Sequence, residues 1–314
     1  MNTNKANLEI FSSTLMELAE KDSDIMVVTS DSRGSGKLVP FGESFSDQII
    51  EVGIAEQNLV GVSAGLASTG KKVFAVSPAS FLTARALEQI KNDIAYSNNP
   101  VNVIGISGGV SYGALGSTHH SIHDIAVLRA INNIQIVIPA DNFETHCAIK
   151  QSADSDCPVY IRFGKKPIPD LHKKGTEFNI GKAITLQEGN DVAFIATGEP
   201  LWPVVEAADE LKNQGISSTV ISMHTIKPFD LDTLMRTVQN CKALITVEEH
   251  SVYGGLGEAC AGYLLEAGVS IPFKRVAIPD EYTVTGSQSD IFKYYGISKT
   301  GLVDVAKDLL MLHD

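Results

Sequence analysis

The strongest constraint on the fold of this 314-residue chain is the regular recurrence of short β-branched runs separated by segments of helical periodicity. In the first half, these runs predict strands at residues 25–30, 73–77, 101–107, 134–139 and 158–163. The segments 83–97 and 142–153 between them have helical periodicity. Strands that alternate with helices predict a parallel sheet covered on both faces. We therefore expect the first half to be an α/β domain.

A second alternation of the same kind follows an irregular segment. Residues 164–183 are polar, contain prolines and glycines and lack periodicity, which predicts a linker or an inter-domain hairpin. Strand-like and helix-like runs then alternate again from Asp191 to Pro279. The length also favours two domains. We expect two parallel-sheet α/β domains, residues 1–165 and 186–314, joined by a linker over residues 166–185.

Composition argues against several functional classes. The formal net charge is −12 at pH 7 and no lysine or arginine cluster occurs, which argues against nucleic acid and anionic membranes as partners. The N-terminus has no apolar core of signal-peptide type, and no apolar run approaches the roughly 20 residues of a membrane span. We expect a cytoplasmic protein. No C-x-x-C pair occurs, so neither a zinc site nor a disulfide framework is indicated for Cys147, Cys157, Cys241 and Cys260.

A glycine-rich loop that follows the strand 101–107 is a candidate functional segment. Its sequence, GGVSYGALGSTHHSIHD (108–124), carries His119, His120 and His123. Ligands of open parallel sheets bind at the carboxyl ends of strands, and histidine titrates near neutral pH. Glycines would let the backbone approach a ligand closely, and a loop that combines them with histidines suits proton transfer. The alternative is a flexible loop with surface histidines, and we interpret His123 as structural.

Glu56 is the second candidate, because it is a lone acid within an apolar segment. In a helix from about Ala55 it shares a face with small and apolar residues: Leu59, Val60, Ser63 and Ala67. A buried carboxylate must be paired, hydrogen-bonded or protonated. The acid could therefore cap a helix, pair with an arginine or be tuned for catalysis.

Several segments resemble one enzyme family. GIAEQNLVGVSAGLA resembles the segment of transketolases, 1-deoxyxylulose-5-phosphate synthases and 2-oxo-acid dehydrogenase β subunits that carries the glutamate of thiamine diphosphate enzymes. GSTHHSIHDIAVLRAINNIQIVIPADNFE resembles their histidine loop and the following strand. TIKPFD and EEHSVYGGLGEA resemble their C-terminal domain. The resemblance runs from residue 8 to the end and implies a pyrimidine-binding domain followed by a transketolase C-terminal domain.

The resemblance implies cofactor roles for four residues. Glu56 matches the glutamate that hydrogen-bonds the N1′ nitrogen of the aminopyrimidine of thiamine diphosphate, favouring the tautomer that deprotonates thiazolium C2. An apolar surround strengthens this hydrogen bond and raises the pKa of the carboxyl group. Phe81 matches the aromatic that stacks on the pyrimidine, or is ordinary core. Asp31 and Ile54 match positions near the cofactor, and Asp31 could instead be a turn-capping aspartate.

Substrate roles follow in the same way. His119 matches the histidine that contacts substrate oxygens near the reacting carbon, and His120 is an alternative in the same loop. Arg162 matches the arginine that holds the substrate phosphate in sugar-phosphate members. The alternative for Arg162 is a strand-end arginine paired to a neighbouring acid. Arg85 is a second candidate for the phosphate.

Two departures from the transketolase pattern concern the sugar. Leu115 stands where transketolases have an aspartate four residues before the histidine, and Ser107 stands where they have a phosphate-contacting histidine. The pocket implied is less polar, which fits a modified or branched ketose phosphate such as apulose 4-phosphate.

A third departure implies a partner. No G-D-G motif, which binds magnesium and the diphosphate in full-length members, occurs in the sequence. The resemblance therefore implies the small, C-terminal subunit of a split transketolase, which moves a two-carbon ketol unit from a ketose phosphate to an aldose phosphate. A second subunit would supply the Mg²⁺ and diphosphate ligands, in an α₂β₂ assembly built through a homodimer. Two alternatives are a 2-oxo-acid dehydrogenase β subunit and a non-catalytic regulatory homologue.

Overall fold

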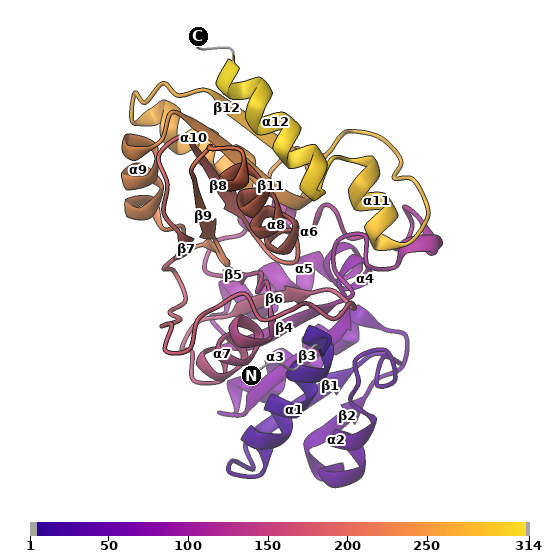
Figure 1. Ribbon diagram of the computed structural model, residues 1–314. Helices are drawn as coiled ribbons and strands as arrows, with labels where there is room; N and C mark the ends of the chain where they lie inside the picture. Colours follow the sequence, from indigo (N-terminus) through magenta and orange to yellow (C-terminus); the bar gives the residue numbers. More distant parts are fainter. Residues whose placement is uncertain (1–4, 312–314) are drawn as a thin grey trace.

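Apolar strands with helices on both sides organise each half of the molecule. The computed structural model describes residues 5–311. In Figure 1 the first half, indigo to magenta, lies below the second half, orange to yellow. Each half contains one sheet between two layers of helices.

The first half supplies six parallel strands to a seven-stranded sheet. The sheet order is β10-β5-β6-β4-β3-β1-β2. Successive side chains of a strand face opposite ways, so Val27 and Phe74 enter one core cluster while Val28 and Ala75 enter another. Both faces are therefore buried. The strands are β1 (Ile25–Thr29), β2 (Ile49–Glu51), β3 (Lys72–Pro78), β4 (Val101–Ile106), β5 (Gln135–Val137) and β6 (Val159–Phe163).

Helices cover both faces of this sheet. One face packs against α1 (Asn7–Ala19) and α7 (Asn142–Ala153). The other packs against α3 (Glu56–Ser68), α4 (Ala79–Arg85), η2 (Ile90–Tyr96) and α6 (Asp124–Arg129). Short helical turns complete the half: α2 (Val39–Ser44), η1 (Ser46–Gln48), α5 (Leu87–Gln89) and η3 (Gly113–Leu115).

The second half repeats the arrangement on a five-stranded sheet of order β12-β11-β8-β9-β7. Its strands are β7 (Ile184–Gln187), β8 (Val192–Ala196), β9 (Ser218–Ser222), β11 (Ala243–Ser251) and β12 (Phe273–Ile278). α8 (Leu201–Asn213) and α12 (Lys299–Met311) cover one face, and α9 (Leu231–Asn240) and α10 (Leu256–Glu266) cover the other. α11 (Gln288–Tyr294) lies beside α12 (Figure 1).

The prediction of two α/β domains with parallel sheets is confirmed in outline. Each sheet also has one antiparallel edge strand, which the sequence did not indicate: β7 pairs with β9, and β10 (Thr225–Lys227) pairs with β5. β10 belongs to the second half of the sequence but joins the first sheet. The predicted helix 83–97 is divided: the backbone of Ala86 leaves the helical region between α4 and α5, and the chain then continues from α5 into the π-helix η2.

Residues 164–183 lie between β6 and β7 and contain no helix or extended strand. The point at which the domains divide stays a prediction. None of the helices within residues 5–311 is long and apolar enough to cross a membrane.

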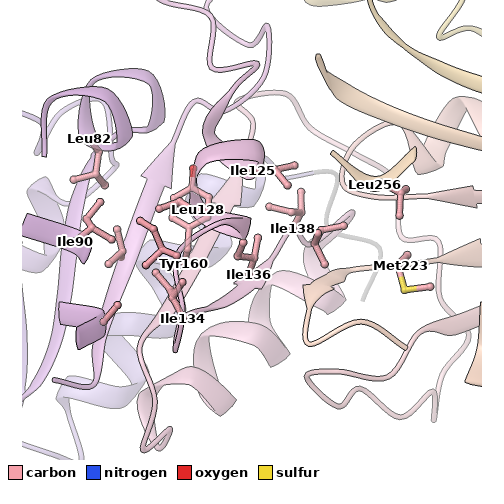
Figure 2. Packing of buried hydrophobic residues seen from close by; sticks show 14 of the residues in the cluster. Leu82, Ile90, Ile125, Leu128, Ile134, Ile136, Ile138, Tyr160, Met223 and Leu256 are labelled. Atoms are coloured by element: carbon pink, nitrogen blue, oxygen red, sulfur yellow. The ribbon is translucent and has the colours of Figure 1, made fainter. Parts of the chain in front are cut away.

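A single hydrophobic cluster runs from one half into the other. Figure 2 shows Ile138, just after β5, with Ile136 on one side and Met223 and Leu256 of the second half on the other. Backbone bonds accompany this packing: Ile138 N donates to His224 O at 2.7 Å, and Gly198 N donates to Ile138 O at 3.1 Å. Apolar burial and backbone pairing therefore join the two halves at the edge of the first sheet.

A buried ion cluster fastens the irregular segment 164–183 to α7. His172 Nδ1 lies 2.8 Å from Asp141 Oδ2, and its Nε2 lies 3.1 Å from Glu144 Oε1. The Glu144 carboxylate also accepts a hydrogen bond from Ser222 Oγ of the second half at 2.5 Å. Burial works to lower the pKa of His172, but the two carboxylates outweigh it and raise that pKa to about 10.

This cluster predicts a pH-dependent contribution to folding. The pKa of His172 is higher in the folded chain than the ordinary value of about 6.5. The contribution of protonated His172 to the stability of the fold is therefore complete below about pH 6.5, and it disappears as the pH rises through about 10. His172→Gln should lower the free energy of unfolding by about 3 kcal/mol at pH 6, since it leaves two buried carboxylates without their cation.

Urea unfolding of the wild-type chain and the variant at pH 6 and pH 9.5 checks this expectation. The difference between the two proteins should shrink at the higher pH. An equal difference at both pH values would show that His172 acts through packing rather than charge.

Candidate active site

Four strand ends bring the candidate residues to one edge of the first sheet. Strands β4, β3, β1 and β2 are neighbours in that order and run parallel. The histidine loop follows β4, Phe81 follows β3, Asp31 follows β1, and Glu56 follows β2. Ligands of such sheets bind beyond the carboxyl ends of the strands. Residues far apart in the sequence thus face one region.

Glu56 is the first residue of α3, and its side chain is only 4% exposed. The predicted helical face is confirmed, because Leu59, Val60, Ser63 and Ala67 are all buried. A carboxylate at the first turn of a helix is favoured by the free backbone N–H groups there. The acid is therefore held at the edge of the core, next to a hollow.

The partner of Glu56 is Arg85, at the end of α4. Arg85 Nη1 donates to both oxygens of the Glu56 carboxylate, at 2.9 and 3.1 Å. The Arg85 guanidinium carbon also lies 4.4 Å from the centre of the Phe81 ring. The hollow has a volume of ≈ 600 Å³. It is lined by Ile54, Ala55, Glu56, Gln57, Asn58 and Arg85.

His119 also contacts Phe81. Its imidazole ring contacts two aromatic rings edge to face: Phe81, with ring centres 5.2 Å apart, and Tyr112, at 5.3 Å. His119 Nδ1 is within hydrogen-bond distance of Thr118 Oγ1, at 3.0 Å. Because Nδ1 is engaged with Thr118 and the ring is only half-buried, Nε2 is the nitrogen that can face a substrate.

A cation completes this row of side chains. Lys165, after β6, is exposed, and its Nζ lies 4.6 Å from the centre of the Tyr112 ring. Contacts thus run from Glu56 through Arg85 to Phe81 and His119, and from His119 through Tyr112 to Lys165.

His120 has a different position from His119. It is 1% exposed, with Nε2 3.0 Å from Gly113 O and Nδ1 2.5 Å from Thr283 Oγ1. A carbonyl oxygen only accepts, so Nε2 carries the hydrogen and Nδ1 accepts from the threonine hydroxyl. Burial lowers the pKa of His120, which favours this neutral form. His120 anchors the loop to the second half and does not face the hollow beside Glu56.

Arg162 lies in the interior rather than at the substrate surface. It is 3% exposed, and its Nη1 donates to Asp124 Oδ1 at 2.7 Å. The remaining contacts are to backbone: Nη1 donates to Ser121 O at 3.0 Å and Nη2 to Glu249 O at 2.8 Å. Burial raises the pKa of Asp124, but the Arg162 charge, His250 and the Tyr160 hydroxyl together outweigh it and hold that pKa below its usual value. The phosphate role expected for Arg162 is therefore corrected to the alternative, a strand-end arginine paired to a neighbouring acid.

The glycines of the histidine loop serve the domain interface. Gly109 has φ +58°, and a Cβ there would lie 2.1 Å from Cδ of Glu249. Glu249 Oε1 accepts a hydrogen bond from Val110 N at 2.8 Å. The expectation that these glycines admit a ligand is therefore corrected at Gly109, where the close neighbour is the second half of the chain. No local pattern pointed to Glu249, because its partner lies far away in the chain.

Of the remaining predicted positions, only Ile54 lines the hollow among the described residues. Asp31 is exposed at the turn after β1, with φ +54°, and its backbone N–H donates to Glu51 Oε1 at 2.6 Å. Ile54 is 73% exposed and lines the hollow. Leu115 is 56% exposed on the loop, whereas Ser107 is buried. Tyr112 and Lys165 were missed, since no local pattern separates them from ordinary loop residues.

These residues fit the aminopyrimidine half of thiamine diphosphate. The ring needs a carboxylate for a ring nitrogen and a flat apolar face. Glu56 lines the hollow, and Phe81 lies next to it across the Arg85 guanidinium. Within residues 5–311, no group of three or more His, Cys, Asp or Glu side chains is arranged to hold a metal ion.

Comparison with known proteins agrees with this fit. The family described as "Transketolase, pyrimidine binding domain" matches residues 4–169, and "Transketolase, C-terminal domain" matches residues 181–302. The chain belongs to the transketolase family. The transketolases are a thiamine-diphosphate-dependent family, so the predicted resemblance is confirmed.

Similar proteins include transketolase subunits of comparable length. An apulose-4-phosphate transketolase subunit of Phocaeicola vulgatus is 46% identical over 301 residues, which cover 96% of each chain. A 6-deoxy-6-sulfo-D-fructose transketolase subunit of Clostridium sp. is 34% identical over 94% of this chain and 91% of its own. A solved structure described as "Split gene transketolase, inactive beta4 tetramer" is 34% identical, with a TM-score of 0.89 over 99% of this chain and 100% of its own.

The contact between Gly109 and Glu249 predicts that the histidine loop is held from the second half. Gly109→Ala should lower the free energy of unfolding by about 2 kcal/mol more than Gly215→Ala. Gly215 is the matched control because it also has positive φ, +79°, but a Cβ added there would meet no atom within 4 Å. Denaturant unfolding measures the difference, and hydrogen exchange of residues 107–123 should accelerate in G109A alone. Equal behaviour of the two variants would contradict the role of this contact.

Proposed function

We propose that the chain is the small subunit of a two-subunit transketolase that transfers a two-carbon ketol unit from a ketose phosphate to an aldose phosphate. One observation carries the proposal: Glu56, Phe81 and His119 meet at one edge of the sheet in a chain that belongs to the transketolase family. A 2-oxo-acid dehydrogenase β subunit would share the fold, but the similar chains of matching length from Phocaeicola vulgatus and Clostridium sp. are transketolase subunits.

Each side chain has one task in this proposal. The thiazolium ring of thiamine diphosphate, when bound, supplies the nucleophilic carbon and accepts the electrons of the cleaved carbon–carbon bond. Glu56 hydrogen-bonds the aminopyrimidine and exchanges a proton with its ring nitrogen. Phe81 presents its face to the same ring. His119, whose ring centre lies 5.2 Å from that of Phe81, moves a proton to or from the substrate oxygen at the reacting carbon.

Lys165 is the cation best placed for the sugar phosphate. The chain has a net charge of −12, so a phosphorylated substrate needs local positive charge. Lys165 is exposed beside Tyr112, which contacts His119. Arg162, by contrast, is fully engaged with Asp124 and two carbonyl groups. We therefore propose Lys165 as the phosphate ligand of this chain.

A partner subunit would complete the cofactor site. The hollow beside Glu56 is open, and the large apolar side chain of Ile54 is exposed at its edge, as a partner surface would require. We propose that the partner supplies the Mg²⁺ and diphosphate ligands, and that two copies of each subunit assemble in the cytoplasm. In support, the similar chain of Phocaeicola vulgatus is named as one subunit of a transketolase, and a similar structure is described as an inactive tetramer of β chains.

Apulose 4-phosphate is the donor that we propose. Support comes from the transketolase subunit of Phocaeicola vulgatus, 46% identical, whose name includes this sugar phosphate. Leu115 is also exposed on the histidine loop, where an aspartate would make the surface more polar.

Reconstitution tests this function. The chain is mixed with the subunit that carries the G-D-G motif, thiamine diphosphate and Mg²⁺, and turnover is measured with apulose 4-phosphate, xylulose 5-phosphate and 6-deoxy-6-sulfofructose. We expect the first donor to have the highest kcat/KM. Absence of ketol transfer from all three, or acyl transfer to a lipoyl domain instead, would overturn the proposal.

Glu56→Gln should reduce kcat in this complex by at least about 100-fold, because the amide cannot exchange a proton with the pyrimidine nitrogen. The subunits should still assemble, since glutamine has the same shape. Size-exclusion chromatography and steady-state rates report the two properties separately. An unchanged kcat would favour a non-catalytic role for the chain.

Lys165→Ala should raise KM for the phosphorylated donor about tenfold, because one charge-assisted hydrogen bond to the phosphate is lost. The kcat should be nearly unchanged. Lys174→Ala, in the same irregular segment and also exposed, is the matched control and should leave KM unchanged. Equal KM values for both variants would exclude Lys165 as the phosphate ligand.

A further inference from the structure

Arg85 contacts Glu56 and Phe81, the two side chains that the proposed function assigns to the aminopyrimidine. Its Nη1 reaches both oxygens of Glu56, at 2.9 and 3.1 Å. Its guanidinium carbon lies 4.4 Å from the centre of the Phe81 ring. One planar group therefore has its edge on the carboxylate and contacts the aromatic ring at the same time.

The guanidinium and the aminopyrimidine have related shapes and would use the same partners in this site. Both are flat, nitrogen-rich groups that stack on an aromatic ring and hydrogen-bond a carboxyl group through a nitrogen in their plane. The side chain of Glu56 is 4% exposed, so its carboxylate has room for few partners. The ring nitrogen and Arg85 Nη1 thus need the same oxygens of Glu56 and the same region beside Phe81.

The burial of the two partners is unequal. The side chain of Arg85 is 49% exposed, whereas that of Glu56 is 4% exposed. Arg85 can therefore turn into water with little loss, because a half-exposed guanidinium remains solvated. Glu56 cannot lose its partner without a replacement, because an unpaired buried carboxylate is expensive. Among the described residues that line the hollow, Arg85 is the sole cation.

We propose that Arg85 competes with the aminopyrimidine of thiamine diphosphate for Glu56 and Phe81, and that cofactor binding displaces it. Arg85 keeps the buried carboxylate paired until the ring replaces it, and so sets a penalty on cofactor affinity. This inference rests on the proposed function. It predicts that loss of Arg85 strengthens cofactor binding, whereas a residue that merely supported the site would weaken binding when removed.

Calorimetric titration of thiamine diphosphate into the assembled two-subunit complex, with Mg²⁺ present, tests the inference. R85Q should lower the Kd by roughly three- to tenfold, since a half-exposed ion pair and a cation–π contact are each modest. R85K keeps the charge but lacks the planar group, and it should give a smaller gain. Arg236, exposed on α9, provides the matched control, and R236Q should leave Kd unchanged.

A second comparison guards against an indirect effect of the substitution. In an E56Q background the carboxylate is gone, so adding R85Q should change the Kd by much less than it does in the wild-type background. An equal gain in both backgrounds would overturn the competition, and so would an unchanged or weaker Kd for R85Q. If the wild-type complex binds no thiamine diphosphate, the proposed function fails, and this inference fails with it. If the wild-type complex binds the cofactor but R85Q shows no gain, the inference alone fails.

Discussion

The buried ion pair between Arg162 and Asp124 is the interaction on which the site depends. Arg162 also binds the carbonyl groups of Ser121 and Glu249, and Tyr160 donates to Asp124 Oδ2 at 2.6 Å. A buried charge without its partner is strongly unfavourable, so these segments stay together. They include the end of the histidine loop, the start of α6 and strand β11 of the second half. The ion pair therefore holds the end of the histidine loop between the two halves of the chain.

The polar groups on the two sides of the site differ in exposure. On the loop side, His120, Gly109 and Arg162 are fixed by contacts with the second half, and His119 is positioned by that frame. On the other side, Glu56 is paired with a half-exposed arginine that can be exchanged for a ligand.

Sequence patterns predicted the elements whose signals are local. The strands around Val27 and Val103 and the helix that begins at Glu56 follow from apolar runs and helical periodicity. Strand β10 and the contact of Arg162 with Glu249 O could not be predicted, because the partners lie far away in the chain. Lys165 was missed for the same reason, since only the fold brings it next to Tyr112. The resemblance pointed to Glu56, but it did not reveal that Arg85 is its partner.

The central claim is that Glu56 acts on the pyrimidine ring of the cofactor. The rate at which the thiazolium C2 proton exchanges with deuterium, followed by NMR in the assembled complex without sugar, tests it most directly. We expect fast exchange with the wild-type chain and a decrease of about 100-fold or more with glutamine in place of Glu56. Equal exchange rates in the two complexes would contradict the claim, because the acid would then have no part in activating the ring.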